Sequence, residues 1–150
     1  MASETKRDLV IVCNYEGSSY FEQLRQETHF DRDNRIKFVG TVYDKDLLKY
    51  LRQECRAYIH GHEVGGTNPS LLEALAQTNE NLVLGVDFNR KVALNTAHYW
   101  SKEPGSLTSL IHQVDGQPES LNLGQAAKRH MQAHYTWEEI VRQYEDLFLK

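Results

Sequence analysis

The segment from residue 60 to residue 76, HGHEVGGTNPSLLEALA, combines a glycine-containing loop with the start of a helix. Asn68 and Pro69 are residue types favoured at the cap and first turn of a helix, so the helix should begin there. Its first backbone N–H groups and the positive end of its dipole then face the loop. Gly65 and Gly66 lack Cβ atoms and let a ligand approach the backbone. This combination predicts a binding site for a phosphate or another anion.

Two familiar phosphate-binding patterns do not fit this segment. No Gly-Lys-Ser/Thr sequence ends the loop, as it would in a P-loop, and the dinucleotide pattern G-x-G-x-x-G is also absent. A purely structural interpretation stays open as well. In it, Asn68, Pro69 and Ser70 only start the helix, and Ser70 with Glu73 imitates a capping box.

Two carboxylates, Glu63 and Glu73, flank the loop. Glu73 falls near the end of the first helical turn, among leucine and alanine neighbours. A carboxylate there is either half exposed or held by a hydroxyl-rich ligand. Ribose hydroxyls would suit it, because a carboxylate binds the ribose in dinucleotide sites.

Histidines offer weaker candidates. His60 and His62 point the same way along an extended chain, but no third metal ligand is evident and the pattern H-E-x-x-H fails at Gly66. We therefore predict no metal site. His130 and His134 are four residues apart in a predicted helix and are expected on its surface.

Length and composition place this segment in one globular domain. The chain has 150 residues, of which 40% are hydrophobic and 25% charged. Its net charge of −4 argues against binding to nucleic acid. The sequence has no run of about 18 apolar residues, so no membrane span is predicted. The N-terminus has no apolar stretch typical of a signal peptide. Cys13 and Cys55 form no C-x-x-C motif and indicate a reducing, cytoplasmic environment.

Short apolar strands alternate with helices along the chain, which is typical of a parallel sheet in an α/β fold. Strands are predicted at residues 8–13, 35–40, 56–60 and 81–86. Helices are predicted at residues 19–28, from Asp44 onward, and at 69–77, 90–97, 106–114, 120–133 and 137–148. Ligands on such sheets bind beyond the carboxyl ends of the strands, which here are the loops at residues 14–19, 40–44 and 60–69.

An apolar stripe at helical spacing on the last predicted helix favours packing into the core. It consists of Trp137, Ile140, Tyr144 and Phe148. Three basic residues are expected along a solvated helix edge instead. They are Lys49, Arg52 and Arg56.

The segment HGHEVGGTNPSLLEALA resembles the donor-sugar motif of retaining glycosyltransferases of family 4. That motif runs from one glutamate, through a glycine-containing loop, to a second glutamate in a Leu-Leu-Glu-Ala helix. In detail it is similar to a bacterial rhamnosyltransferase subgroup that builds capsular and cell-wall polysaccharides. The stretches IKFVGTVYDKDLLKYLRQECRAYIH, FNRKVALNTAHYW and YTWEEIVRQYEDLF resemble other parts of the same family. The resemblance implies a Rossmann-like parallel sheet flanked by helices, forming the C-terminal half of a GT-B fold.

The resemblance also implies an activity, namely transfer of a sugar from a nucleotide diphosphate with retention at the anomeric carbon. The subgroup favours dTDP-rhamnose as the donor. The backbone amides of Gly66, Thr67 and Asn68 would hold the distal phosphate or the sugar. Glu63 would accept hydrogen bonds from sugar hydroxyls, and Glu73 would hold the ribose hydroxyls.

Further donor-binding positions come from the loops after the first two strands. Val42 and Tyr43 would lie near the base. Asn14 and Glu16 occupy the loop where the family often has a glycine pair near the phosphates, which is a departure from its pattern.

The spacing of the two glutamates is a second departure. The usual pattern of the family is E-x7-E, whereas nine residues separate Glu63 from Glu73. Gly65 therefore occupies the position of the first glutamate in the general pattern. The subgroup shares this longer loop, so Glu63 and Gly65 are both assigned to the donor site.

Residues 1–150 are expected to form a single nucleotide-sugar-binding domain. The first strand of that domain and the N-terminal acceptor domain of the family are expected to lie outside this sequence, so the chain would be a fragment that is inactive alone. The expected partners are a nucleotide-sugar donor and the acceptor domain, and no further cofactor is expected. The surface that would face the acceptor domain is expected to be exposed in this chain, which favours self-association. The full enzyme would work in the cytoplasm, at the inner face of the membrane. The alternative is a non-enzymatic Rossmann-like module for nucleotide binding or interaction.

Overall fold

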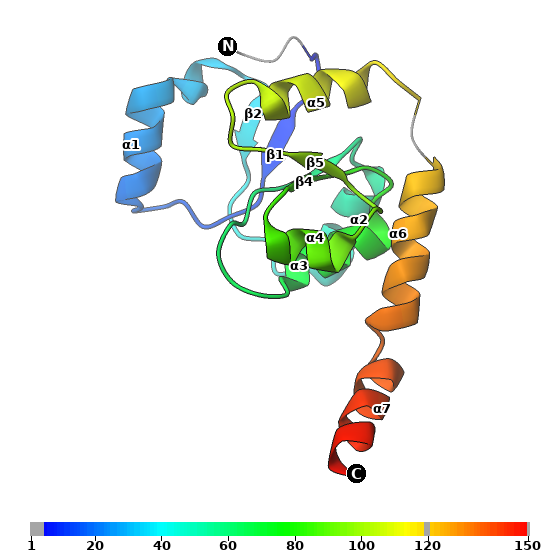
Figure 1. The fold of residues 1–150 in the computed structure, drawn as a ribbon. Coiled ribbons are helices and arrows are strands. Elements are labelled where there is room, and N and C mark those ends of the chain that lie inside the picture. Colours follow the sequence, from blue (N-terminus) through cyan, green and yellow to red (C-terminus); the bar gives the residue numbers. More distant parts are fainter. Residues whose placement is uncertain (1–4, 119–120, 150) are drawn as a thin grey trace.

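The chain folds as an α/β protein with parallel strands (Figure 1), and the computed structural model describes residues 5–118 and 121–149. Strand β1 (Leu9–Ile11) pairs with β2 (Ile36–Phe38). A second sheet has the strand order β3-β4-β5, with β3 at Tyr58–His60, β4 at Asn81–Leu84 and β5 at His98–Trp100. The predicted fold of parallel strands flanked by helices is confirmed, with the strands divided between two sheets.

Helices connect the strands and cover them. They are α1 (Ser19–Thr28), the 3₁₀ helix η1 (Phe30–Arg32), α2 (Lys45–Glu54), α3 (Pro69–Gln77), α4 (Asp87–Ala93), α5 (Ser106–Asp115), α6 (Leu121–His134) and α7 (Trp137–Phe148). The side chains of Asp44, Asn68 and Thr136 cap α2, α3 and α7 by accepting hydrogen bonds from backbone N–H groups of the first turn, and the cap at Asn68 is the predicted one. The side chain of Ser18 caps α1 in the same way.

Strand β5 was not predicted, and the helix expected at residues 90–97 lies at Asp87–Ala93 instead. Leu94 ends that helix with a φ of 47°, and the chain then turns into His98–Trp100. Three residues that include a histidine carry too little apolar pattern to predict a strand. This strand is stabilised by its pairing with β4, whose four residues are all buried. Such pairing with a distant segment cannot be seen in the local sequence of residues 98–100.

Helix α3 contributes the centre of the core. Leu71, Ala74 and Leu75 are fully buried against Val83 of β4 and against α6. Helix α6 comes so close that a Cβ added at its Gly124 would stand 2.7 Å from the Cα atom of Asn79. This packing fixes α3 relative to the second sheet.

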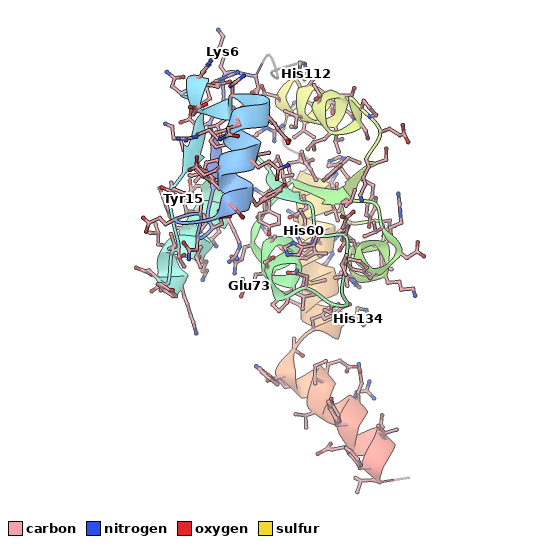
Figure 2. All side chains as sticks on the ribbon, turned by 90° about the vertical axis from the view of Figure 1, so that its left-hand side faces the viewer. Lys6, Tyr15, His60, Glu73, His112 and His134 are labelled. Atoms are coloured by element: carbon pink, nitrogen blue, oxygen red, sulfur yellow. The ribbon has the colours of Figure 1, made fainter. Side chains whose placement is uncertain are left out.

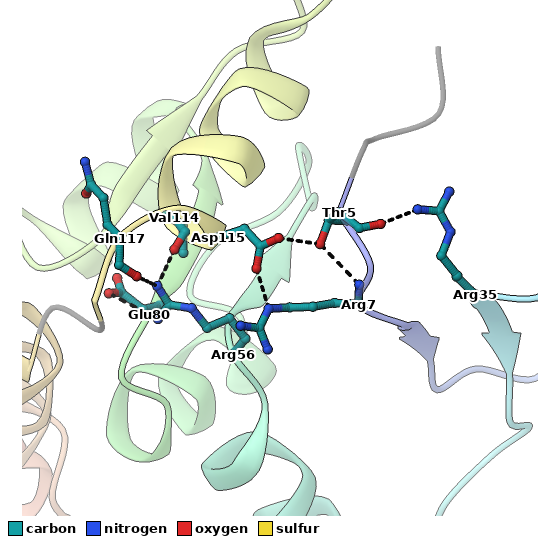
Figure 3. Close-up of polar contacts among 8 residues, drawn as sticks. All are labelled: Thr5, Arg7, Arg35, Arg56, Glu80, Val114, Asp115 and Gln117. Carbon is teal, nitrogen blue, oxygen red and sulfur yellow. Dashed lines mark hydrogen bonds and ion pairs between the residues drawn. The ribbon is translucent and has the colours of Figure 1, made fainter.

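Polar contacts tie the two sheets together (Figure 3). Asp115, at the end of α5, accepts hydrogen bonds from the hydroxyl of Thr5 (2.6 Å) and from Arg7. Arg35, beside β2, donates to the backbone carbonyl of Thr5. Because α5 packs on β5, these contacts join the strands of the first sheet to the second.

Arg56, which precedes β3, makes a second set of polar contacts between distant segments (Figure 3). Its guanidinium donates to the backbone carbonyls of Val114 and Gln117 and lies 3.8 Å from the carboxylate of Glu80. The Glu80 side chain is 2% exposed and also lies 2.8 Å from His98, so this buried charge has the partners that it needs. The expectation that Arg56 lies on a solvated edge is wrong, since its side chain is only 11% exposed.

Helix α7 leads away from the rest of the molecule beyond α6 (Figure 1). Trp137, Tyr144 and Phe148 of its apolar stripe are 81%, 59% and 77% exposed, so the predicted core packing of these side chains is wrong. Helical periodicity shows that one face is apolar, and it does not show that this chain covers that face. Among the described residues, no helix is long and apolar enough to cross a membrane.

We predict that Gly124→Ala lowers the free energy of unfolding by about 1–3 kcal/mol, because the added methyl group meets the backbone of Asn79. Alanine would otherwise favour a helix by about 1 kcal/mol over glycine. Chemical denaturation measures the change. Gly66→Ala is the matched control, because no described atom lies within 4 Å of a Cβ added there. A Gly124→Ala protein as stable as the wild type would contradict the close packing of α6.

Candidate functional site

Strand β3 leads directly into the glycine-containing loop and then into α3. The side chain of Asn68 accepts hydrogen bonds from the backbone N–H of Ser70 (2.9 Å) and from its hydroxyl (2.7 Å). Tyr58 of β3 donates its hydroxyl hydrogen to Ser70 at 3.3 Å, and Pro69 occupies the first helical turn. These residues therefore do start the helix, and their hydrogen bonds fix where α3 begins.

The loop between these two fixed ends is open. Residues 61–67 are all exposed. Gly65 has a φ of 120°, a conformation that L side chains rarely adopt, so this position favours glycine. A Cβ added at Gly65 or Gly66 meets no described atom within 4 Å. A ligand can therefore approach the backbone just before α3, where the positive end of the helix dipole favours an anion.

Each of the two predicted carboxylates is held by a basic side chain from another element. Glu63 pairs with Lys102, which follows β5, and Glu73 pairs with Arg52 of α2 at 2.7 Å. The side chains of Glu63 and Glu73 remain 47% and 53% exposed. In place of the capping box with Ser70 that the purely structural interpretation offered, Glu73 thus has a partner on a neighbouring helix.

Sequence reasoning assigned neither cation to the site. Arg52 was expected on a solvated edge, and this is wrong, because its side chain is only 14% exposed. Lys102 follows the unpredicted β5, so nothing in the pattern placed it near the glycine-containing loop. Recognition of β5 would have placed Lys102 at the carboxyl edge of the sheet, where ligands of such folds bind.

The remaining predicted site residues follow the strands of the other sheet. Asn14 comes after β1 and is exposed. Val42 and Tyr43 come after β2, where Val42 is half-buried and Tyr43 is 88% exposed. Residues 63–68 thus lead into α3 and Glu73 lies within that helix, whereas Asn14, Val42 and Tyr43 follow the strands of the β1-β2 sheet.

Figure 2 labels residues that lie next to strands of both sheets. Lys6, which precedes β1, and His112 of α5 lie at one end of the molecule, and Tyr15, His60 and Glu73 lie farther from that end. Tyr15 follows β1, and His60 is the last residue of β3. The residue that follows β1 and the residue that ends β3 therefore both lie away from the end that holds Lys6 and His112.

The end of β3 is fixed by buried polar side chains. His60 is 1% exposed, and its ring stacks on the rings of Tyr58 and His62 with centroid distances of 6.1 and 5.1 Å. Burial, and then the nearby His62, lower the pKa of His60 from 6.5 to about 4. Asn89 of α4, which sequence reasoning did not single out, donates to the carbonyls of His62 (2.9 Å) and Leu84 (3.0 Å). It therefore joins the ends of β3 and β4 behind the loop.

The histidines outside this region form no second site. Within residues 5–118 and 121–149, no three side chains of His, Cys, Asp or Glu gather into a group that could hold a metal ion. A ring nitrogen of His130 lies 2.9 Å from the carbonyl of Val92, so His130 is half-buried rather than on the surface as predicted. His134 is exposed, as predicted.

The same fold occurs in a sucrose-phosphate synthase from Thermosynechococcus elongatus, with a TM-score of 0.75 and 20% sequence identity over 93% of this chain. No protein-family model and no curated protein matches the sequence. At this identity the likeness shows the fold alone, which is the predicted α/β fold of parallel strands flanked by helices. The chain spans 37% of the length of the synthase chain.

We predict that the protein loses stability as the pH falls from about 6.5 to about 4. In this window the buried imidazole of His60 stays neutral, whereas the unfolded chain would bind a proton there, so lower pH favours unfolding. The part due to His60 amounts to at most about 3 kcal/mol. His60→Phe keeps an aromatic ring that cannot titrate, and it should flatten the curve of unfolding free energy against pH. An unchanged pH dependence in this variant would contradict the assignment.

We predict that Gly66→Val weakens the binding of dTDP several-fold and leaves the fold intact. The β-branched side chain would crowd the approach to the start of α3, yet no described atom lies close enough to strain the loop. Titration calorimetry measures the affinity, and thermal unfolding checks the fold. Equal affinity in the variant would exclude Gly66 as a position of close approach.

Proposed function

We propose that this chain is the donor-binding domain of a retaining glycosyltransferase that adds a sugar to a bacterial surface polysaccharide. The glycosyltransferase-like fold supports the class of enzyme. One observation carries the proposal. The end of β3 and the start of α3 are both fixed, and the glycine-containing loop that joins them is open at the carboxyl edge of the sheet. The resemblance of residues 60–76 to the donor motif supports rhamnose, carried by dTDP, as the sugar.

In this proposal the start of α3 binds the diphosphate of the donor. The backbone amides of Gly66, Thr67 and Asn68 hold the distal phosphate or the sugar. Negative charge develops on the leaving diphosphate when its bond to the anomeric carbon breaks. The positive end of α3 stabilises that charge without reorganisation, because the helix is already fixed by its burial. No further cofactor takes part in the proposed reaction.

The remaining residues recognise the other parts of the donor. Glu63, held by Lys102, accepts hydrogen bonds from hydroxyls of the sugar, and Glu73 accepts them from the pentose. Val42 and Tyr43 contact the base, and Asn14 lies toward the phosphates from the other sheet. The exposed side chains of Asn14 and Tyr43 leave room for such a ligand.

We assign the acceptor to a separate N-terminal domain of the enzyme. Catalysis between two substrates depends on holding both in register, so a domain that binds only the donor should bind nucleotide without transferring sugar. The full enzyme would work in the cytoplasm at the inner face of the membrane. The exposed apolar side chains of this chain also favour self-association when it is studied alone.

Calorimetric titration with dTDP, UDP and thymidine tests the proposed function. We expect both diphosphates to bind, and thymidine to bind at least about tenfold more weakly, because hydrogen bonds to the charged phosphates are lost. Failure of both diphosphates to bind would overturn the proposal. Turnover of dTDP-rhamnose by the 150-residue chain alone would overturn the assignment of the acceptor to another domain.

We predict that Glu73→Gln weakens dTDP binding by about 1–3 kcal/mol, because a neutral amide accepts a weaker hydrogen bond from a pentose hydroxyl. The melting temperature should change little, since the Glu73 side chain is half exposed and the glutamine amide oxygen can still accept a hydrogen bond from Arg52. Glu139→Gln is the matched control, because it breaks an Arg–Glu pair of the same 2.7 Å length on α7. A lower melting temperature with unchanged affinity would show that Glu73 only supports the fold.

A further inference from the structure

One side chain outside the glycine-containing loop holds a carboxylate of the proposed site. Arg52 lies in the last turn of α2, and its Nη2 atom is 2.7 Å from Oε2 of Glu73 on α3. The two side chains differ in exposure, with 14% for Arg52 and 53% for Glu73. A well-buried guanidinium therefore reaches a carboxylate that still faces solvent.

The backbone at Arg52 is fixed as well. Its carbonyl accepts hydrogen bonds from the hydroxyl of Thr78 at 2.9 Å and from the thiol of Cys55 at 3.3 Å. Thr78 is fully buried and ends α3, the helix that carries Glu73. The end of α2 is thus attached to α3 through Thr78, and the guanidinium reaches Glu73 from a fixed base.

This arrangement differs from the ion pairs on the outer helices. Glu22 with Arg25, and Arg142 with Glu139, join residues of a single helix, and both of those arginine side chains are about half exposed or more. The Arg52–Glu73 pair joins two helices and has one buried partner. Planar guanidinium groups suit such buried pairs, because less side-chain freedom is lost when their geometry is fixed in advance.

We propose that Arg52 is a positioning residue for the donor nucleotide, holding Oε2 of Glu73 so that Oε1 is free to accept a hydrogen bond from a hydroxyl of the pentose. This inference rests on the proposed function, because it concerns the same nucleotide. The ion pair with Arg52 runs through Oε2, and the side chain of Glu73 is 53% exposed, which leaves Oε1 available to a ligand. A carboxylate fixed before binding loses less freedom when the hydroxyl arrives, and this preorganisation increases affinity.

The test compares dTDP with 2′,3′-dideoxythymidine diphosphate, which keeps the base and both phosphates and lacks the pentose hydroxyl. We expect the wild type to bind dTDP at least about tenfold more tightly than the dideoxy compound, as for a hydrogen bond to a charged group. Arg52→Met, which keeps an unbranched apolar side chain and removes the guanidinium, should reduce this preference several-fold by weakening dTDP alone. Arg52→Lys, which keeps the charge, should retain part of the preference and serves if the methionine variant does not fold.

Two further variants isolate the role of Arg52. In a Glu73→Gln background, Arg52→Met should have no additional effect on dTDP, because the group that it positions is already changed. Arg142→Met removes an arginine from an Arg–Glu pair of equal length on α7 and should leave both affinities unchanged. Thermal unfolding of every variant separates a loss of affinity from a loss of fold.

Three results would overturn the inference. Arg52→Met could weaken both nucleotides equally, which would indicate a structural role, or it could weaken neither. The wild type could bind both nucleotides equally, which would exclude the hydroxyl contact and leave the proposed diphosphate site standing. If the wild type binds neither nucleotide, the proposed function itself fails, and the role of Arg52 fails with it.

Discussion

Burial of the inner face of α3 is the constraint on which the site depends. Leu71, Ala74 and Leu75 have no exposed surface, and each buried leucine contributes about 1.5–3 kcal/mol. The ion pair of Glu63 with Lys102 at the exposed loop contributes about 0–1 kcal/mol by comparison. Core packing therefore decides where α3 lies, and the surface contacts adjust to it. Because the helix cannot shift, its N-terminal amides keep a fixed position at the end of β3.

In the proposed function, a fixed helix and an open loop together explain how a small segment would bind the diphosphate of the donor. The loop needs no inward-facing apolar side chain, since α3 and β3 carry the packing on either side of it. Glycine at position 65 permits the backbone turn that its φ of 120° requires. The departure from the usual spacing of the two glutamates fits this arrangement. Glu63 and Glu73 are held by cations from different elements, so their separation along the chain does not by itself set their positions.

Local signals in the sequence were sufficient for the elements that frame the site. The cap at Asn68, the proline after it and the parallel α/β fold all follow from short-range patterns, and the structure confirms them. Contacts between distant segments were not predictable in this way. Arg52 and Arg56 were expected along a solvated helix edge, because nothing near them in the sequence indicates a partner. Their partners, Glu73 and Glu80, come near them only through the packing of α2, α3 and β4. The same limit applies to α7, whose pattern is helical and whose apolar face this chain leaves exposed.

The proposed function requires the open loop and the start of α3 to bind the diphosphate of a nucleotide. Amide NMR spectra of the ¹⁵N-labelled chain, recorded during titration with dTDP, locate the bound nucleotide. We expect the largest chemical-shift changes on the backbone amides of Gly66, Thr67 and Asn68, with little change along α7. Saturable binding whose largest changes lie away from this segment, or spectra that do not change at all, would exclude the diphosphate from this loop.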